Sequence, residues 1–398
     1  MTSPPVAFDG TPPTSDEVRN VLRGVQDPEL HASIVDLGMV GDITVTDDGS
    51  VLVGVALTTA GCPLRHQIQT DVQSKVDGIP GVTAVEVAYS EMDQAQRSAV
   101  MSRARRAAAE RAPDTAVPAT TRVLAVASGK GGVGKSSVTA NLAAALAARG
   151  LVVGVLDADI WGFSIPRMLG IRARLAAERA EDGRGKITPL PLEVGTGRLE
   201  VVSMGLLVDD EDTALMWRGL ILSKAVEQFL TDVAWGELDY LLIDMPPGTG
   251  DIQMALGRLL PQTELIVVTT PGVNAQKVAA RVADMARRSY LKVAGIIENM
   301  TEFVAPDGTR HTIFGSGGGD RLAKLTGAPV IARIPIEAAV SAGGDSGRPV
   351  AIDAPASPAG SAFGDLAARI VTDVLPPVDM AGCTARMLDA VDAALESR

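Results

Sequence analysis

Gly129-Lys130-Gly131-Gly132-Val133-Gly134-Lys135-Ser136 is the stretch that decides the fold of this chain. The apolar run Val123 to Ala127 comes directly before it, and a helical run, Ser137 to Ala148, directly after it. Strand, glycine-rich loop and helix therefore occur in the order of a phosphate-binding loop. Glycines let backbone N–H groups approach phosphate oxygens, and the dipole of the following helix favours negative charge. We predict that residues 129 to 136 bind the phosphates of ATP.

The side chains of this loop suit a nucleotide with its metal. Lys135 supplies a point charge for the phosphates, Ser136 offers a hydroxyl to Mg²⁺, and Ser137 is placed to donate to an inner phosphate. Lys130 is not required by the general pattern, yet it has several phosphates within reach. The alternative interpretation is that Lys130 is a solvated loop lysine.

Carboxylates follow two other strand-like runs. Leu241-Leu242-Ile243-Asp244 is an apolar strand that ends in a carboxylate, as expected of an aspartate that holds Mg²⁺ through water. The stiff loop 245–251 after it is suited to sensing the γ-phosphate. Asp157 and Asp159 end another strand, where a carboxylate can polarise the attacking water. We expect Asp159 to take that role, while Asp157 either assists it or is a capping carboxylate.

Short apolar runs recur after residue 122, and helical stretches separate most of them. They are Val123 to Ala127, Val152 to Leu156, Leu199 to Ser203, Tyr240 to Ile243, Leu265 to Thr269, Val293 to Ile297 and Val330 to Ile334. This alternation predicts an α/β fold with a mostly parallel sheet flanked by helices. Ligands of such sheets bind beyond the carboxyl ends of the strands.

The chain of 398 residues is long enough for two domains. Residues 1–13 are rich in Pro, Thr and Ser and predict a disordered leader. Residues 14–95 contain two helical and three strand-like segments, which indicate a small α+β domain. Residues 96–121 form an Ala, Arg and Pro linker, residues 122–375 the nucleotide-binding domain, and residues 376–398 a tail helix.

The charge balance restricts the partners. The net charge is −12, and the first 95 residues hold fourteen acidic and four basic side chains, so nucleic acid and anionic membranes are repelled. One basic stretch, with Arg103, Arg105, Arg106 and Arg111, is best explained as a solvated spacer helix, and the alternative is contact with nucleic acid or an acidic partner. Two cysteines provide no disulfide framework, and neither a signal peptide nor a spanning segment is present, so we expect a cytoplasmic protein.

With these residues assembled, the chain resembles the Mrp/ApbC family of iron–sulfur cluster carrier ATPases, relatives of the MinD and ParA switches. Further blocks that carry the resemblance are residues 157–166, 216–219, 240–251, 298–300 and 313–319. The N-terminal part is similar to the small domain fused to many of these carriers and also found in iron–sulfur maturation proteins. Its marks are residues 27–30, 33–40 and 58–63.

The resemblance implies a homodimer in which Lys130 contacts nucleotide across the interface, which couples nucleotide state to dimer geometry. It further implies that Asn299 binds the adenine, that residues 333–336 flank the base, and that apoproteins and iron–sulfur assembly proteins are partners. We therefore predict a slow ATPase that carries clusters, with Lys130, Lys135 and Asp159 as catalytic residues.

The sequence departs from this family at one place. After Glu298-Asn299-Met300 the cluster-binding members carry a Cys-x-x-Cys pair, whereas residues 301–311 contain no cysteine. Asp307 and His311 are alternative ligands there, although a surface turn explains Asp307 as well. The candidate sulfur ligands are Cys62, at the expected start of a helix, and Cys383, in the tail. The alternative function is an ATP-switched scaffold that no longer binds metal.

Overall fold

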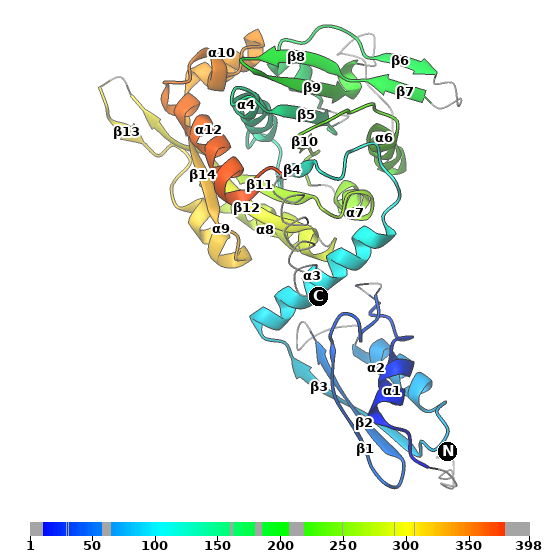
Figure 1. Ribbon diagram of the computed structural model, residues 1–398. Helices are drawn as coiled ribbons and strands as arrows, with labels where there is room; N and C mark the ends of the chain where they lie inside the picture. The colour runs from blue at the N-terminus through cyan, green and yellow to red at the C-terminus, as the bar shows by residue number, and fades with distance from the viewer. Residues whose placement is uncertain are drawn as a thin grey trace, which may run out of the picture. The chain divides into compact units, whose positions relative to one another are not determined.

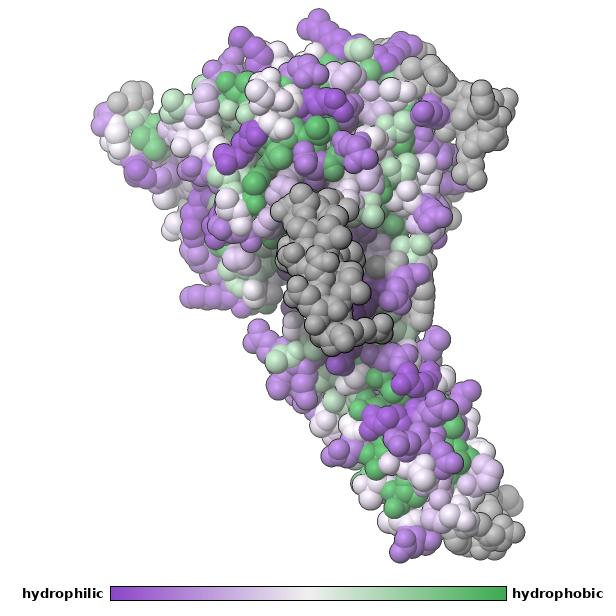
Figure 2. All heavy atoms as spheres, in the orientation of Figure 1, coloured by the Kyte–Doolittle hydropathy of each residue, from purple (hydrophilic) through white to green (hydrophobic). Residues whose placement is uncertain are grey.

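The computed structural model describes residues 11–28, 30, 32–57, 65–159, 162–179, 185–206, 219–248, 250–289, 291–305 and 307–378. The chain divides into two compact units, residues 1–111 and 112–398 (Figure 1). Hydrophilic and hydrophobic residues are interspersed over the larger unit on the face shown in Figure 2. Within the described ranges, no helix is long and apolar enough to cross a membrane.

The smaller unit is an α+β fold around a three-stranded sheet in the order β1–β2–β3. Strands β1 and β2 pair antiparallel, while β2 and β3, which have one helix between them along the chain, pair parallel. Thr14 caps the first helix, because its hydroxyl accepts from Glu17 N and the Glu17 carboxylate accepts from Thr14 N. The elements are α1 (Ser15–Leu22), β1 (Val40–Val45), β2 (Ser50–Leu57), α2 (Arg65–Val76), β3 (Ala84–Glu91) and α3 (Gln94–Arg111).

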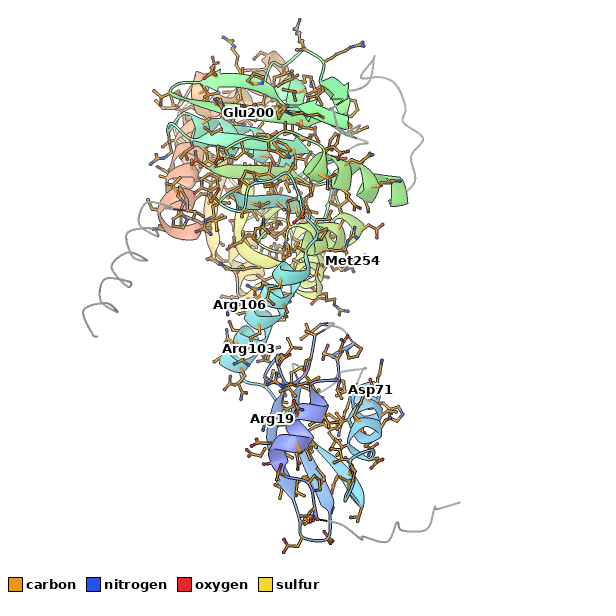
Figure 3. The ribbon with its side chains drawn as sticks, turned by 45° about the vertical axis from the view of Figure 1, so that its right-hand side comes forward. Arg19, Asp71, Arg103, Arg106, Glu200 and Met254 are labelled. Carbon is orange, nitrogen blue, oxygen red and sulfur yellow. The ribbon has the colours of Figure 1, made fainter. Side chains whose placement is uncertain are left out.

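The basic stretch is the second half of α3, on which Figure 3 labels Arg103 and Arg106. Val100 and Ala104 on this helix are buried. The Arg103 guanidinium donates to the carbonyl of Leu37 at 3.0 Å, within the same unit. One face of α3 therefore packs, so this helix is not solvated on all sides.

The larger unit is built on a nine-stranded sheet in the described part of the chain, with β4 near its centre. All seven predicted apolar runs lie in its strands, which confirms the α/β fold. These strands are β4 (Arg122–Ser128), β5 (Val152–Asp157), β9 (Gly197–Ser203), β10 (Tyr240–Asp244), β11 (Glu264–Thr269), β12 (Lys292–Val304) and β14 (Val330–Ile336), and they pair parallel.

Two short strands at the edges were not predicted. β8 (Leu190–Val194) pairs antiparallel with β9, and β13 (Arg310–His311) pairs antiparallel with the end of β12. Both have mostly half-exposed or exposed side chains, so they lack the continuous apolar run that identifies a central strand. A separate antiparallel pair consists of β6 (Ala176–Arg179) and β7 (Gly185–Thr188).

Helices cover both faces of the large sheet (Figure 1). One layer holds α4 (Lys135–Ala147), α5 (Ile165–Met168), α10 (Ala338–Ser346), α11 (Val350–Asp353) and α12 (Pro358–Arg369). The other layer holds α6 (Gly219–Thr231), α7 (Gly250–Leu259), α8 (Val273–Arg288) and α9 (Gly318–Thr326). Short turns of helix, η1 (Met204–Leu206) and η2 (Ile370–Val374), complete the unit. Alanines of α4 are buried, which allows close packing against the sheet and α12.

We predict that Tyr240→Phe destabilises the larger unit. The Tyr240 hydroxyl is buried and donates to the carbonyl of Leu375 at 2.6 Å, and burial raises the pKa of this phenol to about 12. Loss of the donor should lower the free energy of unfolding by about 1–2 kcal/mol, measured by chemical denaturation. Tyr89→Phe is the control, because its hydroxyl donates to Arg65 O at an exposed position. An equal effect of the two substitutions would contradict this prediction.

Candidate active site

The sheet order brings the predicted loop and the predicted carboxylates together. β10 lies between β4 and β5, with Asp244 in register with Val126 on one side and Asp157 on the other. The carboxyl ends of these parallel strands therefore lie at the edge where the loop 129–134 leaves β4. The candidate site is thus at the carboxyl edge of the sheet, as the fold predicts.

The glycines of the loop have two structural roles, which are to adopt a positive φ and to allow close packing against a neighbouring helix. Gly132 and Gly134 have φ of 79° and 81°, which strongly favours glycine, and a Cβ at Gly131 or Gly132 would meet nothing within 4 Å. In contrast, a Cβ at Gly129 would lie 2.4 Å from the backbone carbon of Val278 in α8. The loop is therefore held against α8 on one side and open on the other, which fits a bound phosphate.

The Asp244 carboxylate collects three donors from the start of α4. One oxygen, Oδ2, lies 2.7 Å from Lys135 Nζ and 2.6 Å from Ser136 Oγ, and Oδ1 accepts from Thr139 Oγ1 at 2.8 Å. The side chains of Lys135 and Asp244 are 7% and 1% exposed. Hydroxyl and carboxylate oxygens so placed are the donor set that Mg²⁺ prefers. Thr139 was not predicted from the sequence, although it lies on the same face of α4 as Lys135, one turn along the helix.

Asp159 and Asp157 have distinct surroundings. Asp159 Oδ2 lies 3.9 Å from Lys135 Nζ, and its side chain is 13% exposed, while burial raises its pKa. Asp157 is fully buried and accepts from the backbone N–H groups of Asp159, Ser164 and Ile165 and from the Ser203 hydroxyl. Burial, followed by the nearby charge of Asp244, raises the pKa of Asp157 to about 7. This geometry supports a positioning role for Asp157 and leaves Asp159 open to a ligand.

The remaining predicted residues differ in exposure. Lys130 is exposed and has no ion pair within the described ranges, while its carbonyl accepts from the Ser128 hydroxyl at 3.1 Å. Ser137 is half-buried at the start of α4. Asn299, within β12, is buried, and its amide donates to the carbonyl of Val133 at 2.9 Å. Asn299 thus supports the loop backbone directly.

Comparison with known proteins decides the family. Residues 119–371 match the family model of the NUBPL iron-transfer P-loop NTPase, and residues 15–87 match that of an iron–sulfur cluster assembly protein. The chain belongs to the NUBPL iron-transfer P-loop NTPase family. This membership confirms the predicted enzyme class, a P-loop ATPase, and the predicted relationship to iron–sulfur carriers.

Two relatives that cover most of the chain are iron-sulfur cluster carrier proteins. The chain is 43% identical to the iron-sulfur cluster carrier protein of Mycobacterium leprae, over 86% of this chain and 89% of that protein. The carrier protein of Synechocystis is 39% identical, over 91% and 98%. Among solved structures, a nucleotide-binding protein of Archaeoglobus fulgidus in complex with ADP is 34% identical, with a TM-score of 0.48, over 61% of this chain and 91% of that chain.

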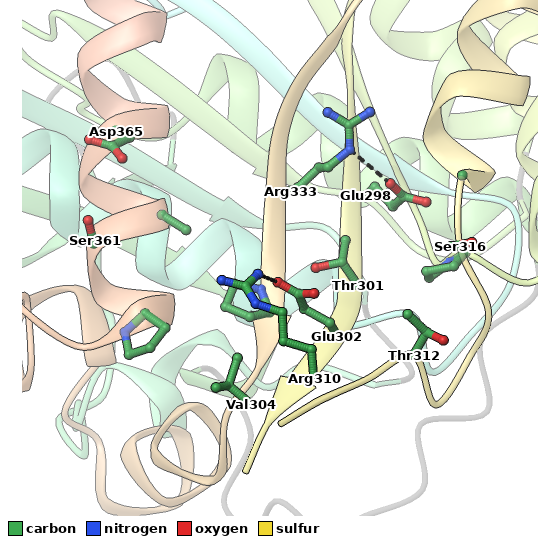
Figure 4. A pocket seen from close by; sticks show the side chains of 15 residues that line it. Glu298, Thr301, Glu302, Val304, Arg310, Thr312, Ser316, Arg333, Ser361 and Asp365 are labelled. Carbon is green, nitrogen blue, oxygen red and sulfur yellow. Dashed lines mark hydrogen bonds and ion pairs between the residues drawn. The ribbon is translucent and has the colours of Figure 1, made fainter. Parts of the chain in front are cut away.

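Strands β12 and β13 close as a hairpin in the segment where the resemblance to cluster carriers implies two cysteines. Glu302 pairs with Arg310, and the rings of Phe303 and His311 stack at 6.5 Å between centroids (Figure 4 shows the ion pair). Asp307 accepts from Thr309 N at 2.9 Å, which lowers the pKa of its carboxyl. Both candidate ligands therefore have structural partners, and no group of three or more metal-ligating side chains occurs in the described residues.

A pocket of about 550 Å³ lies beside this hairpin. Figure 4 shows Glu298 and Arg333 from adjacent strands, with Glu302 and Arg310 nearby. Glu298 is buried, accepts from Gly319 N at 2.9 Å and lies 3.3 Å from Arg333 Nε. This bridge ties α9 to the strand that presents Asn299. The candidate thiols Cys62 and Cys383, and Thr249 of the sensing loop, lie outside the described residues.

We predict that Asp157 makes stability depend on pH. Its pKa of about 7 in the folded protein exceeds the ordinary aspartate value of 3.8, so the native state binds more protons between these values. The free energy of unfolding of the nucleotide-free protein should fall as the pH rises from about 4 to about 7. Asp157→Asn should make this slope shallower, while the raised pKa of Asp159 leaves part of it, measured by chemical denaturation across that range. An unchanged slope in the variant would show that another group causes it.

Proposed function

We propose that this protein is a dimeric, ATP-dependent carrier that binds iron–sulfur clusters and transfers them to apoproteins. The observation that carries the proposal is the Lys135–Ser136–Asp244 arrangement at a glycine loop, in a chain whose first unit matches an iron–sulfur cluster assembly protein. Two relatives that cover most of the chain are named iron-sulfur cluster carrier proteins. The cluster is the cargo of this ATPase.

The proposed roles at the ATP site follow from position. The N–H groups of residues 129–134 and the ammonium of Lys135 hold the phosphates, with Ser137 at an inner phosphate. Ser136 and Asp244 hold Mg²⁺, Asp159 orients the attacking water, and Asn299 contacts the adenine. Bound Mg²⁺ supplies positive charge for the phosphate oxygens.

The partners and the domain roles are part of the same proposal. Lys130 is exposed at the mouth of the loop, so it is free to reach nucleotide bound to a second copy. Apoproteins and iron–sulfur assembly proteins are the partners, nucleic acid and membranes are not, and the cytoplasm is the site of action. In this proposal, residues 14–95 recruit the client proteins. Residues 122–375 change conformation with the bound nucleotide, and residues 96–121 link these two domains.

A second candidate is an ATP-switched scaffold that recruits clients without holding metal. The closed hairpin of residues 301–311 favours it, because Glu302, Phe303, Arg310 and His311 partner one another where the family cysteines are expected. Both candidate functions include ATP hydrolysis. They differ in whether the protein itself binds an iron–sulfur cluster.

We predict that the two loop lysines have separable effects. Lys135→Ala should weaken Mg²⁺–ATP binding by about tenfold or more, because a charge-assisted contact is lost. Lys130→Ala should leave ATP binding within about threefold but abolish ATP-dependent dimerisation. Isothermal titration and analytical ultracentrifugation measure the two effects. Exposed Lys277 on α8 provides a control, Lys277→Ala, which should change neither. Normal ATP-dependent dimers of Lys130→Ala would refute the predicted contact across the dimer.

We predict that reconstitution will distinguish carrier from scaffold. Anaerobic incubation of the full chain with iron and sulfide should yield a cluster that Cys62→Ser or Cys383→Ser diminishes, because thiolates are the usual ligands. Iron and labile sulfide per dimer, and transfer to an apoprotein acceptor, are the measurements. The absence of cluster and of transfer in wild type would reject the carrier and leave the scaffold.

A further inference from the structure

A basic pocket of about 410 Å³ lies at the end of α5, apart from the loop that holds the phosphates. Its volume is within the ~300–1,000 Å³ range of ligand pockets. Arg167, Arg172 and Arg174 line it, and Asp345 is the acidic residue among them. Arg167 and Arg172 are exposed and have no hydrogen bond or ion pair from their side chains in the described part of the chain. In a protein of net charge −12, this is a local excess of positive charge.

The backbone of this pocket is tightly built. Gly170, after α5, and Gly347, after α10, have φ of 70° and 72°, and a Cβ on Gly347 would lie 2.4 Å from the Cα of Gly170. The opposite wall is closed by a hydrogen bond from Leu175 N to Leu206 O at 3.1 Å. Only glycine allows the segments after α5 and α10 to approach so closely. This close contact fixes the backbone beside the arginines.

Both walls of the pocket are anchored on one carboxylate of the nucleotide site. Asp157 Oδ2 accepts from Ser164 N and Ile165 N, at 3.1 and 3.3 Å, which fixes the start of α5. The same oxygen accepts from Ser203 Oγ at 3.2 Å, and Ser203 Oγ in turn accepts from Gly205 N at 3.1 Å in the second wall. A shift of the backbone or side chains around Asp157 or Asp159 would therefore be transmitted to both walls of the pocket through these hydrogen bonds.

We propose that this pocket binds an acidic segment of a client protein through its carboxylates, with an affinity that depends on the bound nucleotide. Guanidinium groups pair well with carboxylates, and complementary charge directs a partner to a local site. A long polyanion is disfavoured, because the rest of this acidic protein repels it, whereas a short acidic segment contacts only the pocket. The client as the source of the segment rests on the proposed function, but the preference for carboxylates does not.

Binding of a fluorescein-labelled hexaglutamate peptide to the full chain, followed by anisotropy at low ionic strength, tests the proposal. The double variant Arg167→Gln, Arg172→Gln should weaken binding by about fivefold or more, since two ion pairs are lost. The control is Arg149→Gln, Arg281→Gln, which removes the same charge from exposed arginines elsewhere in the unit and should stay within about twofold. Circular dichroism verifies that both variants fold.

Further measurements test which ligand the pocket prefers and whether the bound nucleotide changes its affinity for the peptide. Affinity should differ by about twofold or more between ADP and a non-hydrolysable ATP analogue, and this difference should vanish in Lys135→Ala. Equal weakening in both double variants, equal binding of a hexaglutamine peptide, displacement by millimolar inorganic phosphate, or no effect of nucleotide would each overturn the proposal. No cluster is needed, so failure here is separate from failure of the carrier function.

Discussion

The withdrawal of the Asp244 carboxylate from water at the end of β10 is the constraint on which the larger unit depends. A buried carboxylate costs several kcal/mol unless paired and hydrogen-bonded. Lys135, Ser136 and Thr139 meet this need from the first turns of α4. The helix is thereby fixed against the strand, and the glycine loop between β4 and α4 takes its path from that fixed helix. The same arrangement that stabilises the fold is the one that suits nucleotide and Mg²⁺.

A second buried carboxylate extends this arrangement outward. Asp157 lies beside Asp244 in the sheet and binds the backbone at the start of α5 and the Ser203 hydroxyl. On the opposite side of the site, Glu298 ties α9 to β12, whose next residue, Asn299, supports the loop backbone. Hydrogen bonds thus connect the site to the start of α5 on one side and to α9 on the other. Such connections are what a nucleotide-driven switch requires, because the ligand must bind its two states differently.

Much of this could be predicted from the sequence because the signals are local. The loop 129–136, the central apolar strands and the carboxylates at their ends follow from residue spacing alone. Thr139 could not be distinguished from an ordinary helical threonine, because its role depends on a strand about a hundred residues away. The bond from Asn299 to Val133 and the antiparallel edge strands β8 and β13 likewise depend on tertiary contacts. The pairing within the 301–311 hairpin could be recognised only when β13 was placed beside β12.

The Mg²⁺ dependence of ATP binding by wild type and Asp244→Asn, measured by isothermal titration with Asp365→Asn as an exposed control, tests the role of this carboxylate most directly. We expect Mg²⁺ to tighten ATP binding by wild type and by the control about tenfold or more. In Asp244→Asn this gain should disappear, while binding without Mg²⁺ persists. An undiminished gain in Asp244→Asn would contradict the central role of this carboxylate.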